Sequence, residues 1–143
     1  MKTVAQLLRA KGNEVVSVSP ATPVFEALQV MAEKNVGALF VLEGESLVGV
    51  FSERDYARKV ILKGKSSKEI PVHEIMTSHV LYIRPGQTIE ECMALMTDKR
   101  VRHLPVLEND RLVGVISIGD VVKAIIAEQE FLIEQLQNYI TGR

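Results

Sequence analysis

Leu112–Asp120 reads Leu-Val-Gly-Val-Ile-Ser-Ile-Gly-Asp, and a near copy, Leu47–Asp55, reads Leu-Val-Gly-Val-Phe-Ser-Glu-Arg-Asp. The copies are 65 positions apart, the difference between 120 and 55. Each begins with a short, apolar, β-branched run that predicts a buried strand, and its glycine indicates close approach of another backbone. The Ser-x-x-Asp that follows predicts a helix start, with the serine as cap and the aspartate in the first turn. The chain therefore twice places a hydroxyl, a carboxylate and helical N–H groups where a strand ends.

The similarity extends outward from these stretches at the same offset and without a gap. Pro20 corresponds to Pro85, and Val41–Glu43 corresponds to Val106–Glu108. A gapless internal match of this kind predicts duplicated structural units. The polar, basic run 63–68 between the copies lacks the glycine spacing of a phosphate-binding loop, which favours a connector. We therefore divide the chain into a first repeat with a lead-in helix (1–63), a linker (64–71) and a second repeat with an extended C-terminal helix (72–143).

Hydrophobic periodicity and turn residues predict the order β-α-β-β-α in each repeat. The expected strands are Glu14–Val18, Ala38–Leu42, Leu47–Phe51, Val80–Ile83, Leu104–Leu107 and Leu112–Ile116. The expected helices are Val4–Arg9, one capped by Thr22 that begins at Pro23 and fades near Asn35, one from Ser52 to about Leu62, one opened by the capping box Thr88-x-x-Glu91, and one from Ile118 to about Tyr139. This order predicts an α+β fold in which the two units pack into one module. The Ser-x-x-Asp helix starts would then lie at clefts between the units, near a pseudo-twofold axis.

Composition excludes several classes of protein. The net charge of −1 argues against general nucleic-acid binding. No apolar run reaches the length of about 18 residues that a membrane span needs, and the first residues lack the apolar core of a signal peptide. The single cysteine, Cys92, rules out an internal disulfide and fits a reducing compartment, so we expect a cytoplasmic protein. Its helical spacing from Ile89 and Met96 favours a small core residue over a reactive thiol.

The last predicted helix outruns the repeat and carries a surplus apolar stripe. The stripe consists of Val122, Ile125, Ile126, Gln129, Leu132, Ile133, Leu136 and Ile140. Such a face must pack either on its own domain or on a partner, and we favour a homodimer contact.

The polar groups expected at the clefts suit a nucleotide. An aspartate at a helix start can accept hydrogen bonds from the two vicinal hydroxyls of a ribose, as Asp55 and Asp120 could. Serine hydroxyls and helical N–H groups favour phosphate oxygens, and arginine supplies a charged fork for phosphate. Apolar strand residues on either side could sandwich a flat base. This inventory fits a nucleotide better than an amino acid or a sugar.

Structural explanations compete with these assignments. Ser-x-x-Asp is a common capping device, Arg54 and Arg58 could form a solvated helix face, and Arg102-His103 could end a helix favourably. Recurrence at equivalent places favours function. Catalysis has little support, because His103 has no nearby nucleophile in sequence and the three histidines lack metal-ligand spacing. No dinucleotide fingerprint or Walker loop is present, so we expect no enzyme activity and no required metal.

Two β-α-β-β-α units that each end in Gly-h-x-Ser-x-x-Asp, where h is apolar, resemble the paired cystathionine-β-synthase (CBS) domains known as a Bateman module. The resemblance covers almost the whole chain. It is closer still, to stand-alone CBS-pair proteins of bacteria and plant organelles, in Ser52–Lys59, Gly64–Lys68, Arg102–Val106 and Ser117–Asp120.

The resemblance implies an adenosyl ligand, namely AMP, ADP, ATP, NAD(H) or S-adenosylmethionine, in clefts that mix the two repeats. In the family the aspartate holds the ribose, and the serine or threonine helps with ribose or phosphate. Carried over, one cleft would use Val50, Ser52, Arg54, Asp55, Thr77, Leu81, Arg102 and His103. The other would use Lys11, Val16, Val36, Gly37, Ala38, Val115, Ser117 and Asp120. Gly37-Ala38 replaces the charged pair there, which implies weaker phosphate chemistry.

We therefore expect a non-enzymatic adenine-nucleotide sensor that changes conformation on binding and signals to an unidentified partner protein. The family also implies a disc-shaped dimer of two modules, which agrees with the surplus stripe on the last helix. One alternative is a constitutive homodimerisation module with vestigial clefts. Another is an enzyme acting on nucleotides, for which the sequence offers no nucleophile or metal site.

Overall fold

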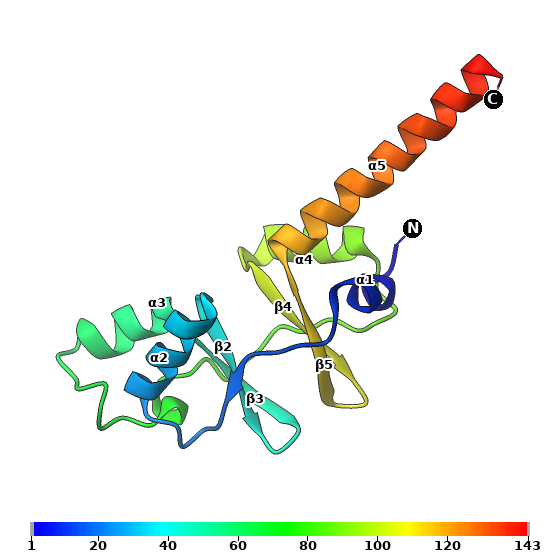
Figure 1. Ribbon diagram of the computed structural model, residues 1–143. Coiled ribbons are helices and arrows are strands. Elements are labelled where there is room, and N and C mark those ends of the chain that lie inside the picture. Colours follow the sequence, from blue (N-terminus) through cyan, green and yellow to red (C-terminus); the bar gives the residue numbers. More distant parts are fainter. Residues whose placement is uncertain (1, 143) are drawn as a thin grey trace. The chain divides into compact units, whose positions relative to one another are not determined.

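The computed structural model describes residues 2–142 and confirms the α+β class (Figure 1). Its helices are α1 (Val4–Lys11), α2 (Val24–Lys34), α3 (Glu53–Tyr56), α4 (Ile89–Lys99) and α5 (Ile118–Thr141), with a π-helix η1 (Ala57–Ile61) and a 3-10 helix η2 (Val72–Glu74). Its strands are β1 (Ser17–Val18), β2 (Ala38–Glu43), β3 (Ser46–Ser52), β4 (His103–Glu108) and β5 (Arg111–Ser117).

The chain forms two compact units. Unit 1 contains the chain up to Asn13, Tyr82–Glu108 and the chain from Val113 onward, and unit 2 contains Glu14–Leu81 and Asn109–Leu112. In unit 2, β1 is parallel to β2 and β2 is antiparallel to β3. The central strand β2 is buried on both faces, since the consecutive residues Leu39, Phe40 and Val41 are all buried. In the edge strand β3, buried residues alternate with partly exposed ones, and Phe51 points into the core.

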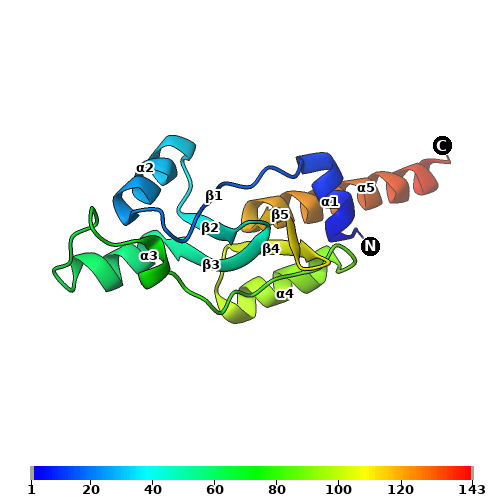
Figure 2. The ribbon, with the colours of Figure 1, turned by 90° about the horizontal axis from the view of Figure 1, so that it is seen from below.

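Unit 1 is built on the β4–β5 hairpin. One face of α4 and the first turns of α5 supply its core, together with α1, which Figure 2 shows beside α5. The buried side chains are Val4, Leu7, Leu8, Ile83, Ile89, Cys92, Met96, Leu104, Val106, Ile116, Val121 and Ala124. The prediction that Cys92 is a core residue is confirmed.

A lead-in segment precedes the first strand of each repeat, residues 4–11 in the first and 72–77 in the second, and each segment packs with the other repeat's sequence. The Val4 N–H donates to the Gln87 carbonyl at 2.9 Å in unit 1, and the Val72 N–H donates to the Thr22 carbonyl at 2.8 Å in unit 2. Gln87 and Thr22 are 65 positions apart, so the two contacts are equivalent. The repeats of the sequence and the packed units are thus different divisions of the chain, and the repeat boundaries stay a prediction.

The glycines of the duplicated stretch lie where the lead-ins cross. A Cβ on Gly49 would lie 2.5 Å from the Met76 sulfur, and a Cβ on Gly114 would lie 2.7 Å from a methyl of Leu8. The predicted close approach of another backbone is confirmed at Gly49, where the Thr77 carbonyl would lie 3.1 Å from an added Cβ. At Gly114 the three nearest atoms all belong to the Leu8 side chain instead.

The predicted strand Val80–Ile83 is wrong. Only Ile83 pairs, in an isolated parallel bridge to Val106, where its N–H donates to the Pro105 carbonyl and its carbonyl accepts from Leu107. Proline has no N–H to continue the ladder, so pairing stops after one residue. The predicted strand Glu14–Val18 likewise shortens to the two residues of β1.

Two predicted helix starts and the course of one helix need correction. Thr22 does not cap α2, because Pro23 is the N-cap residue and the Thr22 hydroxyl accepts from the Ser19 N–H at 3.2 Å instead. Thr88 accepts from the Glu91 N–H as predicted, but the Glu91 carboxylate accepts from the Gln87 amide, so the box is only half formed. The helix after Ser52 is regular only for α3 and continues as the π-helix η1.

Candidate functional site

Both Ser-x-x-Asp motifs form reciprocal capping boxes. The Asp55 N–H donates to the Ser52 hydroxyl at 3.1 Å and the Ser52 N–H donates back to the Asp55 carboxylate at 3.0 Å. The corresponding distances for Asp120 and Ser117 are 3.1 and 2.9 Å. The predicted helix starts are therefore confirmed, and each capping box fixes an aspartate at the end of a strand.

In unit 2, further groups converge on Asp55, whose side chain is only 12% exposed. The Thr77 hydroxyl donates to Oδ1 at 3.2 Å, and the Lys59 ammonium lies 3.2 Å from the same oxygen. Lys59 also donates to the Ile75 carbonyl at 3.0 Å. Thr77 is fixed by its backbone, because it exchanges two hydrogen bonds of 2.8 and 2.9 Å with Val50. A threonine hydroxyl and an ammonium thus hold this carboxylate in one orientation.

In unit 1, the Lys11 ammonium forms an ion pair with Oδ2 of Asp120 and donates to the Val115 carbonyl at 2.8 Å. Partial burial alone would raise the pKa of Asp120. The hydrogen bonds from Lys11 and Ser117 outweigh that effect and hold the pKa of Asp120 below its ordinary value. Asp120 is therefore a stable anion that is paired with the Lys11 ammonium.

His103 begins β4 in the same unit. The residue is exposed to solvent, yet partial desolvation lowers its pKa. The Lys11 and Arg102 charges lower the pKa further, against the opposing effect of Asp120. The Ile118 N–H at the start of α5 donates to the Arg102 carbonyl at 2.8 Å, just as the Glu53 N–H donates to the Gly37 carbonyl at 3.0 Å in unit 2. The Arg102-His103 pair is thus tied to the helix start that carries Asp120.

The structure divides the sixteen predicted site residues between the two units. Unit 2 contains Val16, Val36, Gly37, Ala38, Val50, Ser52, Arg54, Asp55, Thr77 and Leu81, and unit 1 contains Lys11, Arg102, His103, Val115, Ser117 and Asp120. Ser52, Asp55 and Thr77 come together in unit 2, as do Lys11, Ser117 and Asp120 in unit 1. Each predicted cleft draws on both units, so its assembly stays a prediction.

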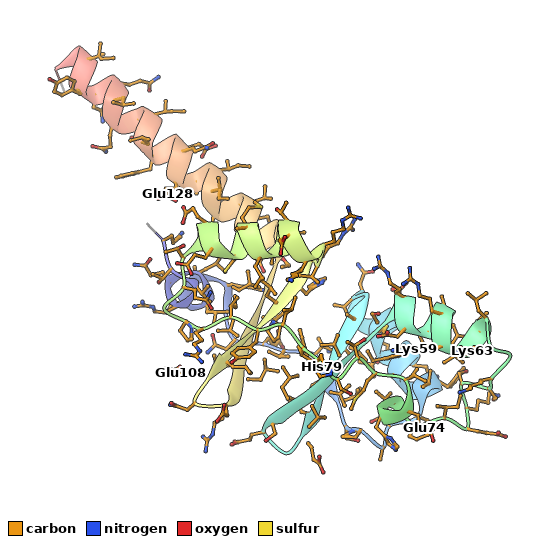
Figure 3. All side chains as sticks on the ribbon, turned by 180° about the vertical axis from the view of Figure 1, so that it is seen from behind. Lys59, Lys63, Glu74, His79, Glu108 and Glu128 are labelled. Atoms are coloured by element: carbon orange, nitrogen blue, oxygen red, sulfur yellow. The ribbon has the colours of Figure 1, made fainter. Side chains whose placement is uncertain are left out.

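Lys59 is a functional candidate that the sequence reasoning missed. Its spacing of four residues from Asp55 on a predicted helix is the signal that could have identified it. The equivalent position in the second repeat is Ala124, which is buried, and Lys11 supplies the positive charge there instead. Figure 3 labels Lys59 in the helical segment that follows Ser52, and Lys63 in the turn after that segment ends.

Unit 2 also has a hollow of about 640 Å³ between α2 and the start of α3. It is lined by Leu28, Met31, Ala32, Asn35, Val36, Gly37, Glu53, Tyr56 and Ala57. Only Val36 and Gly37 belong to the predicted site. The Asp55 carboxylate is not part of this lining, which separates the hollow from the Ser-x-x-Asp group.

Residues 2–142 contain no cluster of three or more His, Cys, Asp or Glu side chains that could hold a metal ion. Burial, followed by the Glu91 and Glu90 charges, raises the pKa of Cys92 to about 11, which disfavours the reactive thiolate. Within that same range, none of the helices combines the length and the apolarity that crossing a membrane requires.

Comparison with known proteins identifies the family. The model of the CBS domain matches residues 5–62 and 72–127. A solved structure from Burkholderia ambifaria MC40-6, of a protein with CBS domains that is named for signal transduction, has a TM-score of 0.82 and 51% identity, covering 90% of this chain and 96% of that one. The mitochondrial protein CBSX3 of Arabidopsis thaliana is 36% identical over 149 residues, covering 98% of this chain and 72% of that protein.

A more distant structure, the hexameric CBS-CP12 protein of bloom-forming cyanobacteria, has a TM-score of 0.69 and 27% identity, covering 84% of this chain and 70% of that one. Because one relative is described as mitochondrial, the cytoplasmic localisation stays a prediction. Proteins built from CBS domains alone are generally regulatory rather than catalytic. The family model covers most of the sequence in two consecutive copies, so the chain belongs to the CBS-domain family.

Proposed function

We propose that this protein is a regulatory module that binds an adenine nucleotide, AMP or a related ligand such as NAD(H), through its two Ser-x-x-Asp groups. CBS-domain proteins are commonly adenosyl-ligand-binding modules, which supports the proposal. One observation supports it best. Twice in the chain, an aspartate in the first turn of a serine-capped helix pairs with a lysine. Neither aspartate needs this arrangement only to cap a helix, since serine alone supplies the cap.

The chemistry of each group suits a nucleotide. A carboxylate can accept two hydrogen bonds from the vicinal hydroxyls of a ribose, and an ammonium within reach can neutralise a phosphate. Asp55 and Asp120 supply the carboxylates, and Lys59 and Lys11 supply the ammonium groups. Binding would signal to a partner protein only if the ligand has different affinities for two conformations of the module.

We also propose that the protein self-associates through α5. The predicted stripe is exposed within unit 1, with Ile126 50%, Leu132 58%, Leu136 54% and Ile140 81% accessible. Figure 3 shows α5 continuing well past Glu128 with its side chains spread around it. The related CBS-CP12 protein is hexameric, which supports self-association as a property that this architecture permits. A homodimer is the simplest closed assembly that would cover the stripe.

The test is a thermal-shift panel with AMP, ADP, ATP, NAD⁺, NADH and S-adenosylmethionine. A ligand at 100 times its dissociation constant adds about 2.7 kcal/mol to the free energy of unfolding, which raises the midpoint by several degrees. Asp55→Ala and Asp120→Ala should each reduce the shift. Asp98→Ala is the matched control, because that side chain is 73% exposed on α4 and it should leave the shift intact.

The alternative is a constitutive homodimerisation module, which the exposed face of α5 favours. It predicts a dimer in analytical ultracentrifugation and no thermal shift with any ligand of the panel at millimolar concentration. Turnover of any nucleotide that stops in Asp55→Ala would instead support an enzyme.

A further inference from the structure

The Lys11 side chain has an unusual position at the Asp120 group. Lys11 is the last residue of α1, and Gly12 follows it with φ +103°. From this helix end its ammonium bridges two acceptors of the second duplicated stretch, Oδ2 of Asp120 and the Val115 carbonyl. The side chain of Lys11 is 32% exposed and that of Asp120 is 20% exposed, so solvent only partly screens the pair.

The equivalent place in unit 2 is arranged differently. The Val50 carbonyl corresponds to that of Val115, and it accepts a hydrogen bond from the Thr77 backbone N–H at 2.8 Å. The hydroxyl of the same residue donates to Asp55 at 3.2 Å. In unit 1, one mobile ammonium on a four-carbon stem therefore takes both roles that a fixed backbone and a short side chain have in unit 2.

This position affects which ligand Asp120 can accept. Among residues 2–142, hydrogen bonds reach Oδ2 of Asp120 from Lys11 and Ser117, and none reaches Oδ1. One ligand hydroxyl can therefore bind Oδ1. A vicinal pair that spans both carboxylate oxygens also needs a site on Oδ2, where Lys11 and Ser117 already donate, and must displace the ammonium. A neutral ligand leaves the displaced ammonium without an anion, whereas a phosphate near the ribose gives it a new partner.

We propose that Lys11 is the specificity-determining residue of the Asp120 group and selects ligands that carry a phosphate next to the sugar. This inference rests on the proposed nucleotide binding. In the ligand-free protein Lys11 holds Asp120, and in the complex the same ammonium binds the phosphate. A neutral nucleoside binds weakly because it breaks an ion pair without replacing it.

The experiment compares AMP with adenosine by isothermal titration calorimetry. The full chain carries Asp55→Ala, so that only the Asp120 group remains, and circular dichroism verifies that each variant is folded. With Lys11 present, we expect AMP to bind at least about tenfold more tightly than adenosine. In Lys11→Met, AMP should bind more weakly and adenosine more tightly, so that the preference falls at least about fivefold.

Two further variants make the result specific. Lys11→Arg keeps the charge and should retain most of the preference for AMP. Lys123→Met removes one positive charge from an exposed position of α5 and should leave the preference unchanged.

The outcomes separate the two proposals. An AMP preference that is the same in Lys11→Met as in the parent overturns the role of Lys11 and leaves nucleotide binding intact. Failure of the folded parent to bind either AMP or adenosine, combined with no thermal shift for the unmodified chain, overturns the proposed function and this inference with it. Loss of AMP binding in Lys11→Met with adenosine binding unchanged also contradicts the exchange, because the freed Asp120 should then bind the sugar better.

Discussion

Each of the two aspartates is paired with a lysine, but the two lysines come from different parts of the chain. Asp55 pairs with Lys59, one turn further along its own helical segment, and Asp120 pairs with Lys11, which is more than 100 positions away in sequence. Ala124 is buried at the position that corresponds to Lys59. Both copies of the motif therefore contain the carboxylate and its serine, but the lysine that pairs with the carboxylate comes from η1 in unit 2 and from α1 in unit 1.

The lead-in segments explain this difference. In unit 2 the chain passes β3 in extended form and pairs with Val50 through its backbone at Thr77. In unit 1 the corresponding carbonyl, that of Val115, accepts from the side chain of Lys11 at the end of a helix. A backbone bridge is fixed once the chain has folded, whereas a lysine side chain can rotate away. Unit 1 thus has the adjustable group and unit 2 the rigid one.

The largest expected effect concerns the glycines beneath the two lead-ins. A Cβ on Gly49 would meet the Met76 sulfur at 2.5 Å and also the Thr77 backbone carbonyl at 3.1 Å. The three atoms nearest to a Cβ on Gly114 would all lie at the flexible end of the Leu8 side chain. Because backbone cannot rotate aside, we expect Gly49→Ala to lower the free energy of unfolding by about 1–3 kcal/mol and Gly114→Ala by less than about 1 kcal/mol.

Urea denaturation of both variants measures this difference. Gly86→Ala is the control, because nothing lies within 4 Å of its added Cβ. Equal losses for Gly49→Ala and Gly114→Ala would contradict the distinction between a backbone bridge and a side-chain contact.

A smaller effect is expected from removing the lysines. Lys11→Met should lower the free energy of unfolding by about 0.5–1 kcal/mol, because an ion pair that is partly exposed to solvent contributes little more than this. Lys59→Met should cost less, because Asp55 keeps the hydroxyl of Thr77. Both losses should shrink in 1 M salt, which screens charges beyond about 3 Å. Chemical denaturation at low and high salt checks this, and the opposite ranking of the two variants would contradict the prediction that Thr77 compensates for the loss of Lys59.

His103 in unit 1 should make the stability of the protein depend on pH. The pKa of His103 is lowered in the folded protein from an ordinary value of 6.5, so the unfolded chain binds this proton more readily. The free energy of unfolding must therefore fall as the pH is lowered through 6.5 and recover as it is raised. His103→Gln should flatten this part of the profile.

Nuclear magnetic resonance titration gives the direct measurement. Lys11→Met removes a positive charge near His103 and should raise the pKa of this histidine toward its ordinary value. An unchanged His103 titration in that variant would mean that Lys11 has no influence on the pKa, which burial and the Arg102 charge would then lower without it.

Much of the fold could be predicted because the sequence repeats itself. Patterns that lie within one segment, such as the hairpin strands and the Ser52 and Ser117 caps, were assigned correctly because they depend on neighbouring residues. The predicted strand at Ile83 failed because its pairing depends on Pro105, a distant residue that lacks an N–H. A local sequence pattern contains no information about such a distant partner.

The candidate site follows the same rule. The local Ser-x-x-Asp motifs identify Asp55 and Asp120. Lys59 lies outside its motif, next to Arg58, where charged residues are typical of a solvated helix face. Only the family resemblance predicts Lys11 as a site residue, because the sequence around it gives no sign of a partner 109 positions away. The sequence also does not predict that each lead-in packs with the other repeat. The two lead-in sequences resemble each other, so either could pack with either repeat.

The smallest expected effect concerns the two equivalent helix ends. Asn35 and Arg100 are both left-handed C-caps with φ 55°, and their N–H groups donate to Met31 and Met96 respectively. Asparagine tolerates this conformation better than arginine does. Arg100→Asn should therefore raise the free energy of unfolding by a few tenths to about 1 kcal/mol, and Asn35→Arg should lower it by a similar amount. If thermal denaturation shows no gain for Arg100→Asn while Asn35→Arg is destabilising, then the arginine side chain makes a stabilising contact in unit 1 that offsets its backbone strain, and the two helix ends are equivalent in geometry but not in energy.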